Sequence, residues 1–140
     1  MLVLDTNHLT ELERPRSQKA ASLVSLLNAY GQDSATTVIT IEEQLAGRIA
    51  QIRSRRELHE QLVFYRRLQD HVDFFASWIV LSFDAEAADL VQSFRSQGIR
   101  IGSMDLKIAA ITIVQDATLL TRNVVDFAKI PGLHFENWLD

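Results

Sequence analysis

The sequence predicts an α/β fold, a three-layer α/β/α sandwich built around a mostly parallel central sheet. Short β-branched or apolar runs alternate with longer segments of helical periodicity along the chain. Acidic side chains follow several of these runs, at the positions where parallel strands would end. The 140 residues fit a single domain spanning residues 1–140, and no repeat or linker divides the sequence.

The first strand is predicted at Leu2–Leu4, where an apolar run ends abruptly in Asp5. A helix is predicted to begin over Thr10–Arg14 and to be interrupted by Pro15. A second helix is predicted over Gln18–Tyr30, since its apolar residues recur near helical spacing and Gly31 follows as a stop.

The stretch "ATTVIT", Ala35–Thr40, is short and β-branched, which predicts a second strand. Two helices are predicted between Ile41 and Ser77, with a break near Ser54. Apolar residues of the second of these helices, from Leu58 to Phe75, form one stripe that we interpret first as core, with a role in a dimer or a partner contact as the alternative. The remaining predicted elements are a strand at Trp78–Phe83, a helix over Ala85–Gln97 capped by Asp84 and ended by Gly98, a short apolar strand at Ile99–Ile101, a buried helix over Met104–Gln115, a strand at Ala117–Thr121 and an edge strand at Leu133–Trp138.

The composition narrows the class of protein. With 47% hydrophobic and 23% charged residues, it is ordinary for a soluble globular chain. The absence of cysteine excludes a disulfide framework and suits a reducing cytoplasm, where we expect the protein. No apolar run is long enough to span a bilayer, and we expect no secretory signal before the strand at Leu2. A net charge of −4 argues against overall attraction to nucleic acid, so such contacts need a basic patch or bound cations.

Carboxylates or amides follow four of the predicted strands. Because the carboxyl ends of parallel strands meet at one edge of a sheet, we expect these side chains to converge. Converging carboxylates repel one another, and a divalent cation removes that conflict. All-oxygen ligation suits Mg²⁺ or Mn²⁺ rather than zinc. The residues concerned are Asp5, Glu43, Asp105, Asn123 and Asp126.

Each acid also has a purely structural explanation. Thr40 and Glu43 have the spacing of a capping box, in which Glu43 bonds back to the Thr40 amide. Ser103 can cap a helix that has Asp105 in its first turn. Asp5 can close a turn, while Asp126 can cap a helix or face solvent. The histidines show no ligand spacing, and we interpret them as surface or capping residues: His8, His59, His71 and His134.

Basic residues are concentrated between Arg48 and Arg67, where six arginines are interleaved with Glu57 and Glu60. The sequence leaves two interpretations open, a solvated helix surface or a face that contacts phosphates.

Four segments resemble the motifs of PIN-domain ribonucleases, in particular the VapC-type toxins of bacterial toxin–antitoxin pairs. They are "LDTN", "VITIEEQLAG", "IGSMDLKIAA", and "LLTRNVVDFAKIPGL" followed by "ENW". The resemblance implies metal-dependent endonucleolytic cleavage of RNA in the cytoplasm. It also implies a cognate antitoxin whose tail covers the active site, in a homodimer or a hetero-oligomer.

By the same resemblance, Asp5 and Asp105 hold Mg²⁺ or Mn²⁺, while Glu43 and Asp126 complete the site. Members of the family differ near Asn123, so the fourth site residue could be Asn123 or Asp126. Thr6 and Asn7 could hydrogen-bond a ligand or the Asp5 carboxylate, or serve only the turn. The arginines expected to hold the RNA backbone are Arg53, Arg55 and Arg56.

Three other classes compete with this interpretation. A haloacid-dehalogenase-like phosphotransferase needs a second Asp two residues after the first, and that position holds Asn7. A response-regulator receiver needs an Asp at the end of a middle strand, where this chain reads "IRSRRE". A non-catalytic α/β binding module, whose acids only cap helices, would not bind Mn²⁺ through Asp5 and Asp105.

Overall fold

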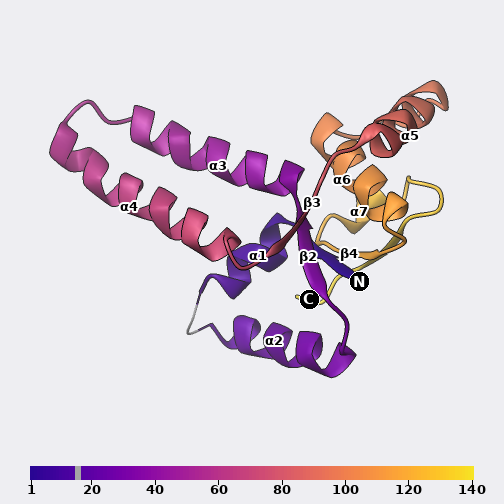
Figure 1. The fold of residues 1–140 in the computed structure, drawn as a ribbon, viewed down its shortest axis with the longest axis horizontal. Helices are drawn as coiled ribbons and strands as arrows, with labels where there is room; N and C mark the ends of the chain where they lie inside the picture. The colour runs from indigo at the N-terminus through magenta and orange to yellow at the C-terminus, as the bar shows by residue number, and fades with distance from the viewer. Residues whose placement is uncertain (15–16) are drawn as a thin grey trace.

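The computed structural model describes residues 1–14 and 17–140, and it confirms the predicted α/β/α sandwich (Figure 1). Within these residues a five-stranded sheet has the order β3-β2-β1-β4-β5, and every pairing is parallel. The strands are β1 (Leu2–Leu4), β2 (Ser34–Thr37), β3 (Ile79–Leu81), β4 (Thr118–Leu120) and β5 (His134–Glu136). The last strand lies at the edge, as predicted.

Helices cover both faces of the sheet. Alternate residues of β1 face opposite layers. Val3 packs in the core with residues of α5 (Ala85–Ser96) and α6 (Ser103–Val114), while Leu2 and Leu4 pack with Leu9 of α1 (Thr6–Leu12) and Phe75 of α4 (Leu58–Phe75). None of the described helices is long and apolar enough to cross a membrane. The helices are α1 (Thr6–Leu12), α2 (Gln18–Tyr30), α3 (Val38–Arg53), α4 (Leu58–Phe75), α5 (Ala85–Ser96), α6 (Ser103–Val114) and α7 (Val124–Phe127).

The boundary between β2 and α3 differs from the predicted one. The strand ends at Thr37, and the residues from Val38 to Thr40 are helical. Thr37 caps the helix, because its hydroxyl accepts a hydrogen bond from the Thr40 amide at 3.1 Å. Ile39 is 5% exposed in the core. The cap and this burial override the strand preference of the β-branched residues.

Two other predicted elements also need correction. The first helix begins at Thr6 rather than Thr10, because Asp5 already caps it. The prediction that Pro15 interrupts this helix falls outside the described residues. Ile99–Ile101 forms no strand, and instead Ile99 and Ile101 pack against the core as the connection between α5 and α6.

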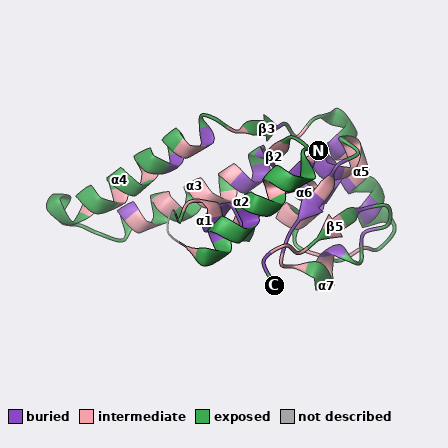
Figure 2. Ribbon diagram, turned by 90° about the horizontal axis from the view of Figure 1, so that it is seen from below, coloured by how far each residue is buried: buried purple, intermediate pink, exposed green. Residues whose placement is uncertain are grey.

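The helices α3 and α4 form a hairpin that projects away from the sheet (Figure 1). Its distal end is largely exposed (Figure 2), and the predicted break between the helices lies at Ser54. The core interpretation of the α4 stripe holds for Phe75, which is 7% exposed, and is wrong for much of the rest of the helix. Four of its apolar residues are more than half exposed: Leu58, Leu62, Tyr65 and Val72.

Candidate active site

Asp5 lies where β1 ends and α1 begins, at the carboxyl edge of the sheet. Its Oδ1 accepts a hydrogen bond from the Thr6 amide at 2.8 Å. Its Oδ2 accepts one from the Thr121 hydroxyl at 3.0 Å. Thr121 follows β4, which pairs with β1, so two neighbouring strand ends orient this carboxylate. The structural explanation for Asp5 was the closing of a turn. The structure instead makes Asp5 the cap of α1, and its carboxylate is also anchored at this edge.

A chain of hydrogen bonds joins Asp5 to two further acids. The Asn123 amide N–H donates to the Thr121 hydroxyl oxygen at 3.1 Å. The side-chain Nδ2 of Asn123 donates to Asp105 Oδ2 at 3.2 Å and to Asp126 Oδ2 at 3.1 Å. Asp126 also lies 3.4 Å from the Lys129 ammonium. Asn123 thus links the carboxylates of Asp105 and Asp126, which come from α6 and α7.

Glu43 does not form the predicted capping box. Because Thr37 is the cap of α3, Glu43 lies beyond the first turn, and that first turn contains no acid. Asp105 does lie in the first turn of α6, but Gly102 occupies the cap position. The Ser103 hydroxyl, expected to cap α6, instead accepts a hydrogen bond from Arg95 at 3.2 Å. Capping therefore leaves Glu43 unexplained and accounts for Asp105 only through the helix dipole.

The electrostatics of the acids indicate a shared site. Burial raises the pKa of Glu43, and the charges of Asp5 and Asp105 raise it further. Burial also raises the pKa of Asp105, as do the charges of Asp5 and Asp126, while the bond from Asn123 lowers it. Burial likewise raises the pKa of Asp5, against its hydrogen bonds from Thr6 and Thr121. Hydrogen bonds from Asn123 and Lys129 hold the pKa of Asp126 below its usual range.

The donor chemistry fits a hard divalent cation, since the groups at this edge of the sheet are partly buried carboxylates. Across residues 1–14 and 17–140, no three acidic or histidine side chains are close enough together to hold an ion directly. Mg²⁺ usually keeps several waters and binds one or two carboxylates, so bridging water is compatible with this arrangement.

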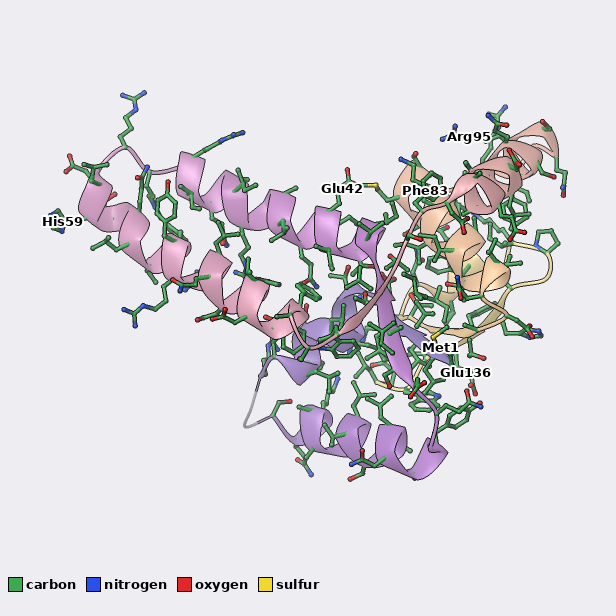
Figure 3. The ribbon with its side chains drawn as sticks, viewed as in Figure 1. Met1, Glu42, His59, Phe83, Arg95 and Glu136 are labelled. Carbon is green, nitrogen blue, oxygen red and sulfur yellow. The ribbon has the colours of Figure 1, made fainter. Side chains whose placement is uncertain are left out.

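The structure separates the predicted substrate-binding residues from one another. Thr6 lies next to Asp5, and Asn7 is exposed in the first turn of α1. The three arginines are exposed where α3 turns into α4. Arg53 lies ten residues after Glu43 on the same helix, a rise of about 15 Å. The side chains in Figure 3 show this end of the hairpin, marked by His59, projecting into solvent. The arginines are Arg53, Arg55 and Arg56.

Sequence reasoning missed some of the residues that shape the site. Thr121 follows β4 directly, so asking which side chain ends each strand would have found it. Two of the histidines interpreted as surface or capping residues are buried, since His8 is 0% and His71 is 3% exposed. His71 accepts a hydrogen bond from Arg48, while His8 accepts one from the Trp138 amide at 3.2 Å.

Comparison with known proteins confirms the predicted resemblance. Over 75 residues, half of this chain, the sequence is 36% identical to Ribonuclease VapC2 of Rickettsia felis. The matching region spans 56% of that relative, just over half of its length. No protein-family profile matches the chain.

Solved structures share the fold over nearly the whole chain. A chain of VapBC2 from Rickettsia felis, crystallised with a DNA fragment from its promoter, superposes with a TM-score of 0.69 at 25% identity, covering 98% of both chains. FitAcB from Neisseria gonorrhoeae gives a TM-score of 0.69 at 26% identity, covering 99% of this chain and 98% of that one. DNA-bound VapBC from Salmonella typhimurium, at 23% identity and a TM-score of 0.75 over 98% and 97% of the two chains, supports the fold alone.

Proposed function

We propose that this chain, which is similar to VapC-type PIN-domain proteins in both fold and sequence, is a metal-dependent endoribonuclease and the toxin of a toxin–antitoxin pair. One observation carries the proposal: Asp5, Glu43 and Asp105 come from separate elements and lie near one edge of the sheet, where the charges of Asp5 and Asp105 raise the pKa of Glu43 and the charge of Asp5 raises that of Asp105. Acids that served only as helix caps would not need to lie close enough to perturb one another's charge. The name of the relative Ribonuclease VapC2 supports RNA as the substrate.

In this proposal Asp5 and Asp105 hold Mg²⁺ or Mn²⁺, directly or through water. A bound ion of this kind lowers the pKa of its water and neutralises charge that develops on phosphate oxygens. Glu43, whose pKa the charges of Asp5 and Asp105 raise, orients the attacking water. Asp126 completes the acidic set from its outer side, and Asn123 positions Asp105 and Asp126 through its amide nitrogen. Thr121 fixes the rotamer of Asp5.

We further propose that a cognate antitoxin binds the chain in a hetero-oligomer, in which toxin copies can also pair. The solved neighbours include VapBC2 bound to a DNA fragment and FitAcB. Several apolar residues of α4 are exposed, including Leu58 at 76% and Leu62 at 61%. Burying such residues against a partner is favourable by about 25 cal/mol per Å² of apolar surface.

Induced expression followed by sequencing of RNA ends tests the proposal. Wild type should arrest growth and create new RNA ends, while Asp5→Asn should do neither. Asp84→Asn is the matched control, because Asp84 is a carboxylate that caps α5 through the Ala87 amide at 2.9 Å. It lies outside the acidic cluster, by which we mean Asp5, Glu43, Asp105 and Asp126. It should behave as wild type.

Purified protein should cleave RNA with Mg²⁺ or Mn²⁺ and not in EDTA. Titration with Mn²⁺ separates the nuclease from a binding module, since Asp5→Asn and Asp105→Asn should each weaken Mn²⁺ binding and Asp84→Asn should not. Identical RNA ends and growth in wild type and Asp5→Asn would refute the toxin proposal.

A further inference from the structure

A cavity of about 320 Å³ opens beside the acidic cluster, among the helices α1, α3 and α4. Glu43 of the cluster lines this cavity, and so does Thr6, whose amide binds Asp5, so a ligand in the cavity would lie next to the proposed reaction centre. Its size is at the lower end of the roughly 300–1,000 Å³ of small-ligand sites. The lining residues are Thr6, Thr10, Glu43, Gln44, Gly47, Arg48, Gln51 and His71.

A buried histidine organises the wall of this cavity. His71 is 3% exposed, and its Nδ1 accepts a hydrogen bond from Arg48 Nε at 2.8 Å. Its Nε2 lies 2.6 Å from the Gln44 carbonyl oxygen and 3.2 Å from Glu13 Oε1. Because Nδ1 accepts, Nε2 carries the proton of the neutral ring. This network holds the Arg48 guanidinium in one orientation, with its Nη1 3.4 Å from the Gln51 carbonyl oxygen.

The hydrogen bonds determine which polar groups remain for a ligand. The carbonyl oxygens of Gln44 and Gln51 are engaged by His71 and Arg48, which leaves their NH₂ groups as donors. Arg48 Nε and Nη1 donate to His71 and Gln51, so Nη2 remains free to donate to a ligand. Among the lining residues the Arg48 charge is matched by that of Glu43, so the wall carries little net charge. Such a wall suits a neutral, acceptor-rich, planar ligand better than a phosphate.

We propose that this cavity binds the base of a nucleotide next to the scissile phosphate and prefers guanine. Single-stranded RNA is recognised largely through splayed bases that hydrogen-bond in pockets. Guanine presents two neighbouring acceptors, O6 and N7. The free Nη2 of Arg48 and a free NH₂ group of Gln44 or Gln51 can donate to these two acceptors together. This inference rests on the proposed nuclease function and assigns Arg48, Gln44 and Gln51 to sequence preference, with His71 as a positioning residue.

The chain offers a substitution that fills the cavity without removing any polar group. A Cβ built at Gly47 would meet no atom within 4 Å, so Gly47→Leu places its side chain in open space that belongs to the cavity. Leu is also a better helix former than Gly, so α3 should fold. Ala46→Leu is the matched control, since Ala46 is the adjacent exposed residue of α3 and lies outside this cavity.

The first measurement is the sequence of RNA ends produced by wild type, Gly47→Leu and Ala46→Leu. Wild type and Ala46→Leu should show guanine enriched at one position beside the cut, and Gly47→Leu should lose the enrichment. On a guanine-containing oligonucleotide, kcat/KM should fall about tenfold or more in Gly47→Leu, the discrimination expected of one good base contact. On the same oligonucleotide with an abasic site there, the variants should cleave equally.

An unchanged cleavage pattern in Gly47→Leu, or an equal loss on the abasic oligonucleotide, would overturn the inference. So would a variant that loses only antitoxin binding, since the cavity would then be a protein-docking site. Fluorescence anisotropy of the labelled oligonucleotides in EDTA measures their binding independently of catalysis. If wild type cleaves no RNA, the proposed function fails, yet tighter binding of the guanine than the abasic oligonucleotide, lost in Gly47→Leu, would still support the pocket. Equal binding of the two would reject it.

Discussion

Asn123 donates a hydrogen bond to Asp105 across 18 positions of sequence, with Nδ2 and Oδ2 3.2 Å apart. The same nitrogen lies 3.1 Å from the carboxylate of Asp126. One neutral donor therefore holds two carboxylates whose charges repel. The two neighbours act on Asp105 in opposite directions, because the Asn123 bond lowers its pKa and the Asp126 charge raises it.

These opposite effects predict that removing Asn123 and removing the Asp126 charge shift the pKa of Asp105 in opposite directions. Asn123→Ala should raise the pKa of Asp105, since the carboxylate loses a donor, and Asp126→Asn should lower it, since a like charge is removed. Carbon-detected NMR titration of the aspartate carboxyls in metal-free protein measures both. Shifts of the same sign in the two variants would contradict the geometry, and Asp84→Asn should leave Asp105 unchanged.

Thr121→Val should weaken metal binding at the acidic site, although the valine side chain has nearly the same shape as threonine. The substitution removes the donor to Asp5 Oδ2 and the acceptor for the Asn123 amide. Changes to residues that orient metal ligands typically cost about 10- to 100-fold in metal affinity or activity. We expect such a loss in Mn²⁺ binding measured by calorimetry. Thr118→Val, at the opposite end of β4, is the control and should retain wild-type affinity.

Much of the fold is predictable because periodicity and caps agree with the final packing. The helix at Gln18–Tyr30 has matching ends, since Ser17 caps it and Gly31 adopts a φ of 70°. The predicted end of the second strand at Thr40 is wrong, because the Thr37 cap and the burial of Ile39 place the start of α3 earlier. Local β-propensity carries no information about burial.

The acids themselves are visible in the sequence, since each lies near a strand or helix end. The residues that position them depend on pairing between distant segments. Thr121 reaches Asp5 only because β1 and β4 are neighbours in the sheet. Similarly, Arg48 meets His71 only because α3 and α4 fold into a hairpin, and no local pattern encodes that contact.

Glu43→Gln should stabilise the metal-free protein while it abolishes cleavage. The substitution removes repulsion with Asp5 and Asp105 and the cost of burying a charge. We expect a gain of about 0.5–1 kcal/mol in unfolding free energy at pH 7, limited by solvent screening in the open cleft. Urea unfolding measures it. Glu42→Gln, at the exposed neighbouring position, should give a smaller change, and a loss of stability in Glu43→Gln would contradict the shared-cleft electrostatics.

His8 should make the fold sensitive to acid. Burial lowers the pKa of His8 to about 4, from an ordinary value of 6.5. The unfolded chain therefore takes up this proton before the folded one does as the pH falls, and stability declines between about pH 6.5 and pH 4. The full loss is about 3 kcal/mol, at 1.36 kcal/mol per pKa unit.

His8→Gln removes this contribution and can retain an acceptor for the Trp138 amide. The difference in unfolding free energy between wild type and variant should shrink, or reverse in sign, as the pH falls from 7 to 4.5. The acids with raised pKa values favour the folded state as the pH falls. They are present in both wild type and variant, so their contributions largely cancel in this difference. A difference that is independent of pH would show that His8 is not held neutral.

The arginines at the hairpin end should contribute to RNA binding and not to metal binding, because about 15 Å of α3 separates Arg53 from Glu43. A triple change of Arg53, Arg55 and Arg56 to Gln should weaken binding of long single-stranded RNA in EDTA. It should lower the slope of log K against log salt by up to about 2, since each phosphate contact contributes roughly 0.7. Arg100→Gln, at an exposed position between α5 and α6, should change the slope by less than about 1. Mn²⁺ affinity should be unchanged in both, and an unchanged slope in the triple variant would mean that these arginines only solvate the helices.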